Sequence, residues 1–254
     1  AIADGSEKEA MLNLQKNFDE LSDAVDAGII SAEKLPYIFV RVKYHKQMEQ
    51  VYSLIKKPEL LTGFIFPKFD IHNAQIFLKS LSDINQSADN IIYAMPILES
   101  TVVSDIRNRI FVLSEIKTML DNYKKYILNI RIGGNDFCNK FGVRRKITDS
   151  IYDIHVVSGI ISDIVNIFSE EYVVSAPVWE YFENADDPSD TAWSDGLKNE
   201  ISKDILNGLF GKTAVHPSQL AVINSELAVS YQDYNDALGI LRWQDSDLAV
   251  SKSF

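Results

Sequence analysis

Apolar, strand-like runs in this chain end abruptly in a charged residue, and helical patterns separate one run from the next. Four such runs end, in chain order, at Arg41, Lys68, Glu99 and Asp136. Repetition of a strand, a charged end and a helix is typical of a (β/α) barrel, which builds its active site at the carboxyl ends of its strands. We therefore expect two acids and two bases to meet at one edge of a parallel sheet.

The alternation of strands and helices predicts a parallel sheet that helices bury. Six strands are expected, at residues 35–42, 63–69, 91–98, 126–132, 172–178 and 211–215. Helices are expected at residues 6–27, 45–55, 73–82, 102–122, 148–170, 197–209, 217–225 and 230–244. A closed barrel needs eight strands, and the chain opens in a helix. The predicted fold is therefore an α/β TIM (β/α)8 barrel whose first one or two strands are missing. The alternative is an open, doubly wound sheet of six strands.

Composition narrows the class of protein. The 254 residues fit one barrel domain over 1–254, N-terminally incomplete, with C-terminal helices from about 217. No apolar run approaches the ~18 residues of a membrane helix, and no signal peptide is visible. The net charge of −11, from 36 acidic and 25 basic residues, argues against a nucleic-acid or membrane surface. The single cysteine, Cys138, excludes an internal disulfide, which favours a cytoplasmic location.

Glu99 and Asp136 follow consecutive strands, so their carboxylates can converge. Adjacent strands lie about 4.8 Å apart, and two carboxylates completed by water and substrate oxygens are a common arrangement for Mg²⁺. Each acid alone could instead cap the helix behind it. Because both follow a strand and both are flanked by Gly, Pro or Ser, we predict that they bind a metal, Mg²⁺ or Mn²⁺.

Other polar residues at the strand ends are candidates for substrate binding or proton transfer. Arg41 can form a bidentate pair with a substrate carboxylate, unless it is an ordinary surface arginine. Lys68 belongs either to the site or to a solvated loop, and a Schiff-base role would need a desolvated amine. His216 is a base or an orienting residue, or it bonds the N-terminus of the next helix. Gly134 and Asn135 extend the site, since glycine allows a ligand to approach the backbone.

Two further arginines lie outside this set. Arg131 lies within a strand and would be unfavourable to bury unpaired, so we expect it to face the barrel interior beside an acid. Arg145 belongs to the basic run 144–146 and is expected in a solvated loop, with contact to a phosphate-bearing ligand as the alternative.

Five motifs together resemble those of one family. They are Val40-Arg41-Val42, Phe66-Pro67-Lys68, Pro96-Ile97-Leu98-Glu99-Ser100, Gly133-Gly134-Asn135-Asp136-Phe137 and Gly211-Lys212-Thr213-Ala214-Val215-His216-Pro217-Ser218-Gln219. Their order and spacing resemble the citrate lyase beta-subunit-like proteins of the HpcH/HpaI aldolase superfamily. The segment 131–137 looks most like the carbon–carbon bond lyase branch associated with bacterial tellurite-resistance and stress gene clusters.

The resemblance implies a TIM barrel in which Glu99 and Asp136 hold Mg²⁺ and Arg41 holds a carboxylate of a small carboxylate or keto-acid substrate. It implies cleavage or formation of a carbon–carbon bond next to a carbonyl, often in a CoA thioester, through an enolate that a divalent ion stabilises. The base would be His216, Lys68 or a metal-bound water. The resemblance also implies a homo-oligomer, either a trimer or a hexamer.

One departure from the family concerns CoA. The family's acidic Asp-Leu-Glu-Asp motif and the region that binds CoA in some relatives would precede Ala1, so CoA binding is unsupported. The predicted function is a cytoplasmic, Mg²⁺-dependent carbon–carbon lyase or aldolase. The alternatives are a thioesterase on the same scaffold and a non-catalytic, ligand-binding barrel of a stress-response cluster. The presence of Arg41, Glu99 and Asp136 together counts against a non-catalytic scaffold.

Overall fold

The central feature of the structure is a sheet of parallel strands. A computed structural model describes residues 6–187 and 189–242 of the chain. Five strands are paired in the order β1-β2-β3-β4-β5. They are β1 (Phe39–Arg41), β2 (Gly63–Phe66), β3 (Tyr93–Leu98), β4 (Ile130–Ile132) and β5 (Val174–Ser175). Each strand lies beside the next one in the chain, as in the wall of a barrel.

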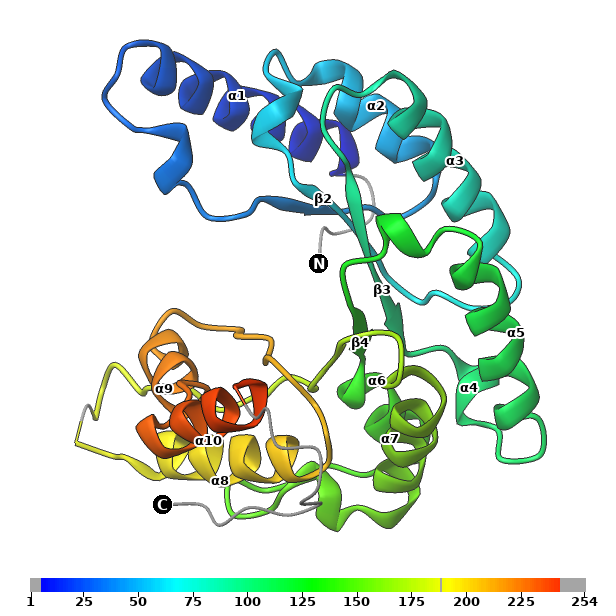
Figure 1. Cartoon of the computed structure of the whole chain (residues 1–254), viewed down its shortest axis with the longest axis vertical. Coiled ribbons are helices and arrows are strands. Elements are labelled where there is room, and N and C mark those ends of the chain that lie inside the picture. Colours follow the sequence, from blue (N-terminus) through cyan, green and yellow to red (C-terminus); the bar gives the residue numbers. More distant parts are fainter. Residues whose placement is uncertain (1–5, 188, 243–254) are drawn as a thin grey trace.

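Helices connect the strands and cover one side of them. They are α1 (Glu7–Asp26), α2 (Lys46–Leu54), α3 (Ala74–Ser87), α4 (Thr101–Ser104), α5 (Arg109–Asp121), α6 (Gly134–Lys140), α7 (His155–Phe168), α8 (Ala192–Leu206), α9 (Gln219–Glu226) and α10 (Tyr231–Leu241). Figure 1 shows α2, α3, α5 and α7 along one side of the strands, with α8, α9 and α10 grouped together. Short 3-10 turns at Ala32–Lys34, Pro58–Leu60, Lys124–Tyr126 and Ile151–Asp153 complete the connections.

Two expected elements are interrupted by local chemistry. The helix expected at 102–122 is divided into α4 and α5, because the Asp105 carboxylate accepts a hydrogen bond from the Arg107 amide and turns the chain. The strand expected at 211–215 is reduced to a single bridge between Lys212 and Ala176. The left-handed backbone of Gly211, with φ of +82°, interrupts the extended conformation at the first residue of this segment.

The two faces of the sheet differ in polarity, because successive side chains along a strand point in opposite directions. The face beneath the helices is apolar, and its buried members are Phe64, Phe66, Ala94, Leu98, Ile130, Ile132 and Val174. The strand register places Arg41, Ile65 and Met95 in one row of the inner face and Ile97, Arg131 and Ser175 in another. The polar side chains of the strands therefore gather on the inner face.

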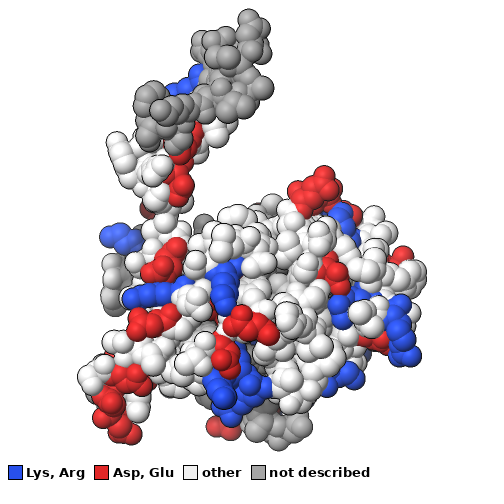
Figure 2. Space-filling model, turned by 90° about the horizontal axis from the view of Figure 1, so that it is seen from below, with Lys and Arg blue, Asp and Glu red and all other residues white. Residues whose placement is uncertain are grey.

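The surface mixes acidic and basic side chains. Figure 2 shows Lys and Arg interspersed with Asp and Glu over one face of the molecule. Every helix within residues 6–187 and 189–242 is too short or too polar to span a bilayer. The last helix, α10, buries none of its residues and leaves large apolar side chains such as Tyr231 and Leu241 exposed.

Candidate active site

The buried carboxylate of Glu99 is the centre of the candidate site. Glu99 follows β3 directly, and its side chain is only 5% exposed. Its Oε1 accepts a hydrogen bond from the Lys68 amide at 2.9 Å and one from Arg41 Nη2 at 3.4 Å. One carboxylate thus links the ends of three neighbouring strands, as the positions of these residues in the sequence predict.

Asp136 supplies a second carboxylate beside Glu99. It lies in the first turn of α6, and its Oδ1 is 3.8 Å from the Lys68 ammonium nitrogen. Burial raises the pKa of Glu99, and the negative charge of Asp136 raises it further, whereas the Lys68 amide and Arg41 lower it. The repulsion between the two carboxylates is therefore only partly compensated by the neighbouring cations, a situation that a divalent cation would relieve.

The glycine pair before Asp136 creates room for protein side chains. A Cβ at Gly133 would lie 2.3 Å from Glu99 Cβ and 2.4 Å from its Oε2, so only glycine leaves Glu99 in place. A Cβ at Gly134 would lie 2.4 Å from Ile151 Cδ1. The space on the Cβ side of Gly134 is filled by packing, and ligand approach to its backbone stays a prediction.

A cleft of about 490 Å³ opens beside the two carboxylates, and its lining includes Lys68, Asp70, Glu99, Ser100, Thr101 and Asp136. Ser100 Oγ and the neighbouring Asn135 Oδ1 are buried without a hydrogen-bond partner in the described part of the chain. A larger cavity, of about 620 Å³, lies between α7 and Asn207, but no acidic or basic side chain other than His155 lines it. The smaller cleft is therefore the better candidate for an active site, because acidic and basic side chains line it.

A divalent cation fits this donor set. Among residues 6–187 and 189–242, no three His, Cys, Asp or Glu side chains come together in a way that could hold a metal. Two carboxylates converge at Glu99 and Asp136, so the protein would supply two charged ligands, and water or substrate oxygens would complete the shell. Mg²⁺ is commonly held in this way, with few protein carboxylates and several exchangeable oxygens.

Lys68 has an unusual backbone. Its φ of +49° makes it the one non-glycine residue with positive φ in the described ranges. This conformation turns its amide toward Glu99, while its side chain is 71% exposed. A Schiff-base role needs a desolvated amine, so the exposure of Lys68 argues against that role.

Replacement of Lys68 by glycine should give a more stable protein than replacement by alanine, by about 1 kcal/mol, because the left-handed conformation is strained only when a Cβ is present. Urea unfolding of the two variants measures this difference. Lys79, exposed in the interior of α3, is the matched control. There alanine should be more stable than glycine by about 1 kcal/mol. If the same residue, glycine or alanine, gave the more stable protein at both positions, the interpretation that the backbone of Lys68 is strained would be contradicted.

His216 is not brought to the cleft. Its ring stacks on Phe182 with the centroids 4.5 Å apart, and its Nδ1 lies 2.9 Å from Ser218 Oγ. It lines a different cavity, together with Val215 and Pro217. Of the predicted proton-transfer residues, Lys68 lies in the cleft and His216 does not.

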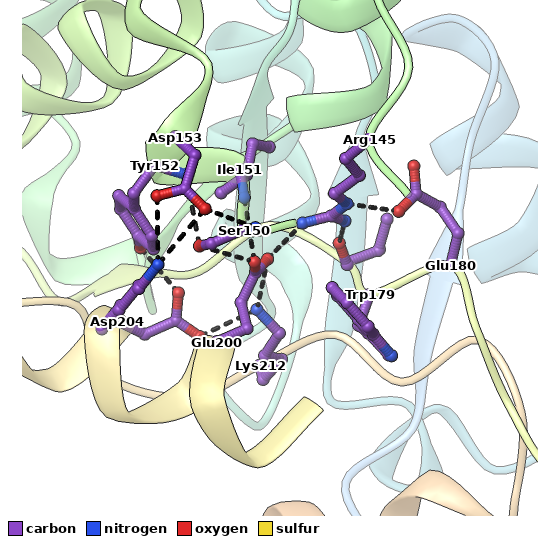
Figure 3. A network of polar contacts seen from close by, with 12 residues as sticks. Arg145, Ser150, Ile151, Tyr152, Asp153, Trp179, Glu180, Glu200, Asp204 and Lys212 are labelled. Carbon is purple, nitrogen blue, oxygen red and sulfur yellow. Dashed lines mark hydrogen bonds and ion pairs between the residues drawn. The ribbon is translucent and has the colours of Figure 1, made fainter. Parts of the chain in front are cut away.

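Arg145 is buried, so the expectation of a solvated loop is wrong for this residue. Its side chain is 0% exposed and donates to Glu200, Glu180 and the Val178 carbonyl. Figure 3 shows how Glu200 lies at the centre of this network, where it also approaches Lys212. A guanidinium held by protein carboxylates in this way is a structural element, not a phosphate site.

The sequence did contain a signal for this network. The buried face of α8 has helical spacing and consists of Leu197, Glu200, Ile201 and Asp204. Two acids on an otherwise apolar face indicate buried cationic partners, which are Arg145 and Lys212.

Comparison with known proteins identifies the class of protein. The fold and the strand-end carboxylates are those of a TIM-barrel enzyme scaffold. The whole chain, residues 1–254, matches the family model described as "C-C_Bond_Lyase of the TIM-Barrel fold". The chain therefore belongs to the TIM-barrel carbon–carbon bond lyase family. The barrel prediction and the resemblance to the carbon–carbon bond lyase branch are both confirmed, and the open, doubly wound alternative is wrong.

Solved structures share the fold at low sequence identity. RipC from Yersinia pestis has a TM-score of 0.61 at 15% identity, over 92% of this chain and 87% of RipC. The citrate lyase beta subunit of M. tuberculosis, complexed with oxaloacetate and magnesium, has a TM-score of 0.54 at 14% identity, over 90% and 83%. Haloferax volcanii malate synthase, in a magnesium/glyoxylate complex, has a TM-score of 0.62 at 12% identity, over 94% and 68%. Comparison with curated proteins finds no match.

Proposed function

We propose that this protein is a Mg²⁺-dependent carbon–carbon lyase or aldolase that acts next to a carbonyl in a small carboxylate substrate. The observation that carries the proposal is the convergence of the Glu99 and Asp136 carboxylates, with Arg41 bound to Glu99, at one cleft of the barrel. The relatives in complex with magnesium and oxaloacetate or glyoxylate support the substrate class.

Glu99 and Asp136 would hold the metal, and Mn²⁺ is an alternative with similar ligand preferences. A bound divalent cation would supply electrostatic stabilisation for negative charge on the substrate oxygens during cleavage. Nothing in the described residues supports a role for CoA, so the proposal is limited to the carboxylate part of the substrate.

Arg41 and Lys68 would perform the remaining steps. The Arg41 guanidinium is 59% exposed beside Glu99, so it can bind a substrate carboxylate and fix its orientation. Lys68, beside Asp136, can take up at Nζ the hydroxyl proton whose removal accompanies cleavage, and can return that proton to the carbon that loses its bond. His216 has no part in this scheme.

Calorimetry of Mg²⁺ binding, with and without pyruvate or oxaloacetate, tests the proposal. We expect Glu99→Gln and Asp136→Asn each to weaken Mg²⁺ binding by more than about 100-fold, because loss of residues that merely support metal ligands already costs 10–100-fold. Asp70→Asn is the control, since Asp70 lines the same cleft but bonds the His72 amide. It should change the affinity by less than about threefold.

Failure of the folded wild-type protein to bind Mg²⁺ would overturn the catalytic proposal and favour a non-catalytic scaffold. If Mg²⁺ still bound after both substitutions, the metal site would lie somewhere other than at Glu99 and Asp136.

We also propose a cytoplasmic location and a homo-oligomer, a trimer or a hexamer. The single cysteine, Cys138, is buried as a free thiol, which suits a reducing compartment. The exposed apolar side chains of α10, including Tyr231, Ile240 and Leu241, support association between copies.

A further inference from the structure

Arg131 is a half-buried cation without a carboxylate partner among the described residues. It lies in β4, on the inner face of the sheet, and its one hydrogen bond runs from Nη2 to Thr213 Oγ1 at 2.6 Å. No Asp or Glu oxygen of the described residues lies within ion-pair distance of its guanidinium, although Arg145 and Arg109 each have such a partner. A guanidinium has five N–H donors, so most of its donor capacity is open to a ligand.

The guanidinium reaches toward the carboxyl ends of the strands. Arg131 shares a row with Ser175, and the bridge between Ala176 and Lys212 lies one residue further along. Thr213 therefore lies two residues beyond the row of Arg131. Ile97 belongs to that row, and Glu99 lies two residues beyond Ile97. Thr213 and Glu99 are thus at the same level of the sheet. The hydrogen bond to Thr213 thus directs the Arg131 side chain toward the level of the carboxylate site.

The charges of the site act on Arg131. Burial lowers its pKa, Arg41 lowers it further, and Glu99 raises it. Arg41, Arg131 and Glu99 therefore share one electrostatic environment. Three cationic side chains, counting Lys68, face two carboxylates in this region, and a divalent cation would add more positive charge. The side chains alone carry one positive charge in excess, and a divalent cation would raise the excess to three, of which a single substrate carboxylate would offset one.

We propose that Arg131 binds a second anionic group of the substrate, so that the site formed with Arg41 and Glu99 on the inner face of the sheet prefers a keto acid with two anionic groups to one with a single carboxylate. The inference rests on the proposed function in taking the carboxylates of Glu99 and Asp136 and the guanidinium of Arg41 as the substrate site. The second group is a carboxylate or a phosphate-type group, since guanidinium recognises both in the same planar geometry. Arg41 binds the carboxylate next to the keto group, and Arg131 selects the substituent at the far end.

Three related keto acids test the proposal by calorimetry. Pyruvate ends in a methyl group, oxaloacetate carries a second carboxylate, and phosphonopyruvate carries a phosphonate in its place. We expect the wild-type protein to bind one of the two keto acids that carry a second anionic group at least about tenfold more tightly than pyruvate. Which of these two binds more tightly identifies the group that Arg131 takes.

The variants Arg131→Met and Arg131→Lys carry the decisive comparison. Arg131→Met should abolish the preference for a second anionic group while changing pyruvate affinity less than about threefold, and Arg131→Lys should keep part of it. Circular dichroism and thermal unfolding establish that each variant is folded. Should the methionine variant not fold, the partial loss expected for the lysine variant decides the question.

An unchanged preference in the Arg131 variants, or no preference in the wild-type protein, would overturn the assignment. Each titration is repeated without Mg²⁺, which separates the contribution of Arg131 to the preference from that of the metal. Loss of Mg²⁺ binding therefore reports on the proposed function alone, and loss of the preference reports on Arg131.

Discussion

Replacement of Glu200 by alanine is expected to lower the free energy of unfolding by about 3–5 kcal/mol, because it leaves buried cations without their counter-charge. The Glu200 side chain is fully buried and accepts hydrogen bonds from Ser150 Oγ at 3.0 Å and the Ile151 amide at 3.0 Å. It also pairs with Arg145 and, at 3.3 Å, with Lys212 (Figure 3). Urea unfolding measures the change.

The control for this prediction is Glu20→Ala, another glutamate-to-alanine change in a helix. Glu20 forms an exposed i,i+4 ion pair with Lys16, and such pairs contribute less than about 1 kcal/mol. If Glu200→Ala were as mild as Glu20→Ala, the network in Figure 3 would not stabilise the fold.

The second large effect is expected for a residue with no side chain. Gly133→Ala should weaken Mg²⁺ binding by at least about tenfold, since a displaced ligand affects the metal as strongly as a lost supporting residue. The added methyl group would meet Glu99 Cβ at 2.3 Å and Oε2 at 2.4 Å, so Glu99 must move. Overpacking should also destabilise the protein by about 1–3 kcal/mol. Calorimetry and urea unfolding of one sample measure both effects.

Gly159→Ala provides the matched control for this substitution. Gly159 lies within α7, and a Cβ there would meet no heavy atom within 4 Å. We expect this variant to be more stable than the wild type by about 0.5–1 kcal/mol, because alanine favours the helix. Its Mg²⁺ binding should be unchanged. Normal metal binding by Gly133→Ala would show that Glu99 does not need its present position.

The order of strands and helices could be predicted from the sequence because the hydrophobic pattern changes period at each boundary. The lengths of the strands could not. Residues 35–38 are as apolar as a strand, yet β1 begins only at Phe39. An apolar run indicates that a segment is buried, but it does not show which of its residues form backbone hydrogen bonds with another strand. The segment 211–215 is also predicted as a strand, but the left-handed backbone of Gly211 interrupts the extended conformation at its first residue, and only Lys212 forms a bridge.

The sequence predicts which four residues lie together at the site, because parallel strands bring their carboxyl ends to one edge of the sheet. They are Arg41, Lys68, Glu99 and Asp136. The role of Gly133 could not be predicted, because it depends on which side chain lies opposite. Arg145 was misplaced because its partner Glu200 is 55 residues away in the chain. Long-range pairing of this kind leaves no local pattern around the arginine itself.

The reduced sixth strand has a consequence for ligand binding. Lys212 is anchored by Glu200 and Asp204 of α8, with only one sheet bridge beside it. The next residue, Thr213, accepts the hydrogen bond of Arg131. A helix outside the cleft thus helps to set the position of a group on the substrate side through charge, in addition to the backbone hydrogen bonds that join residues 210 and 211 to the β5 region. Substitutions in α8 should consequently alter substrate selectivity as well as stability.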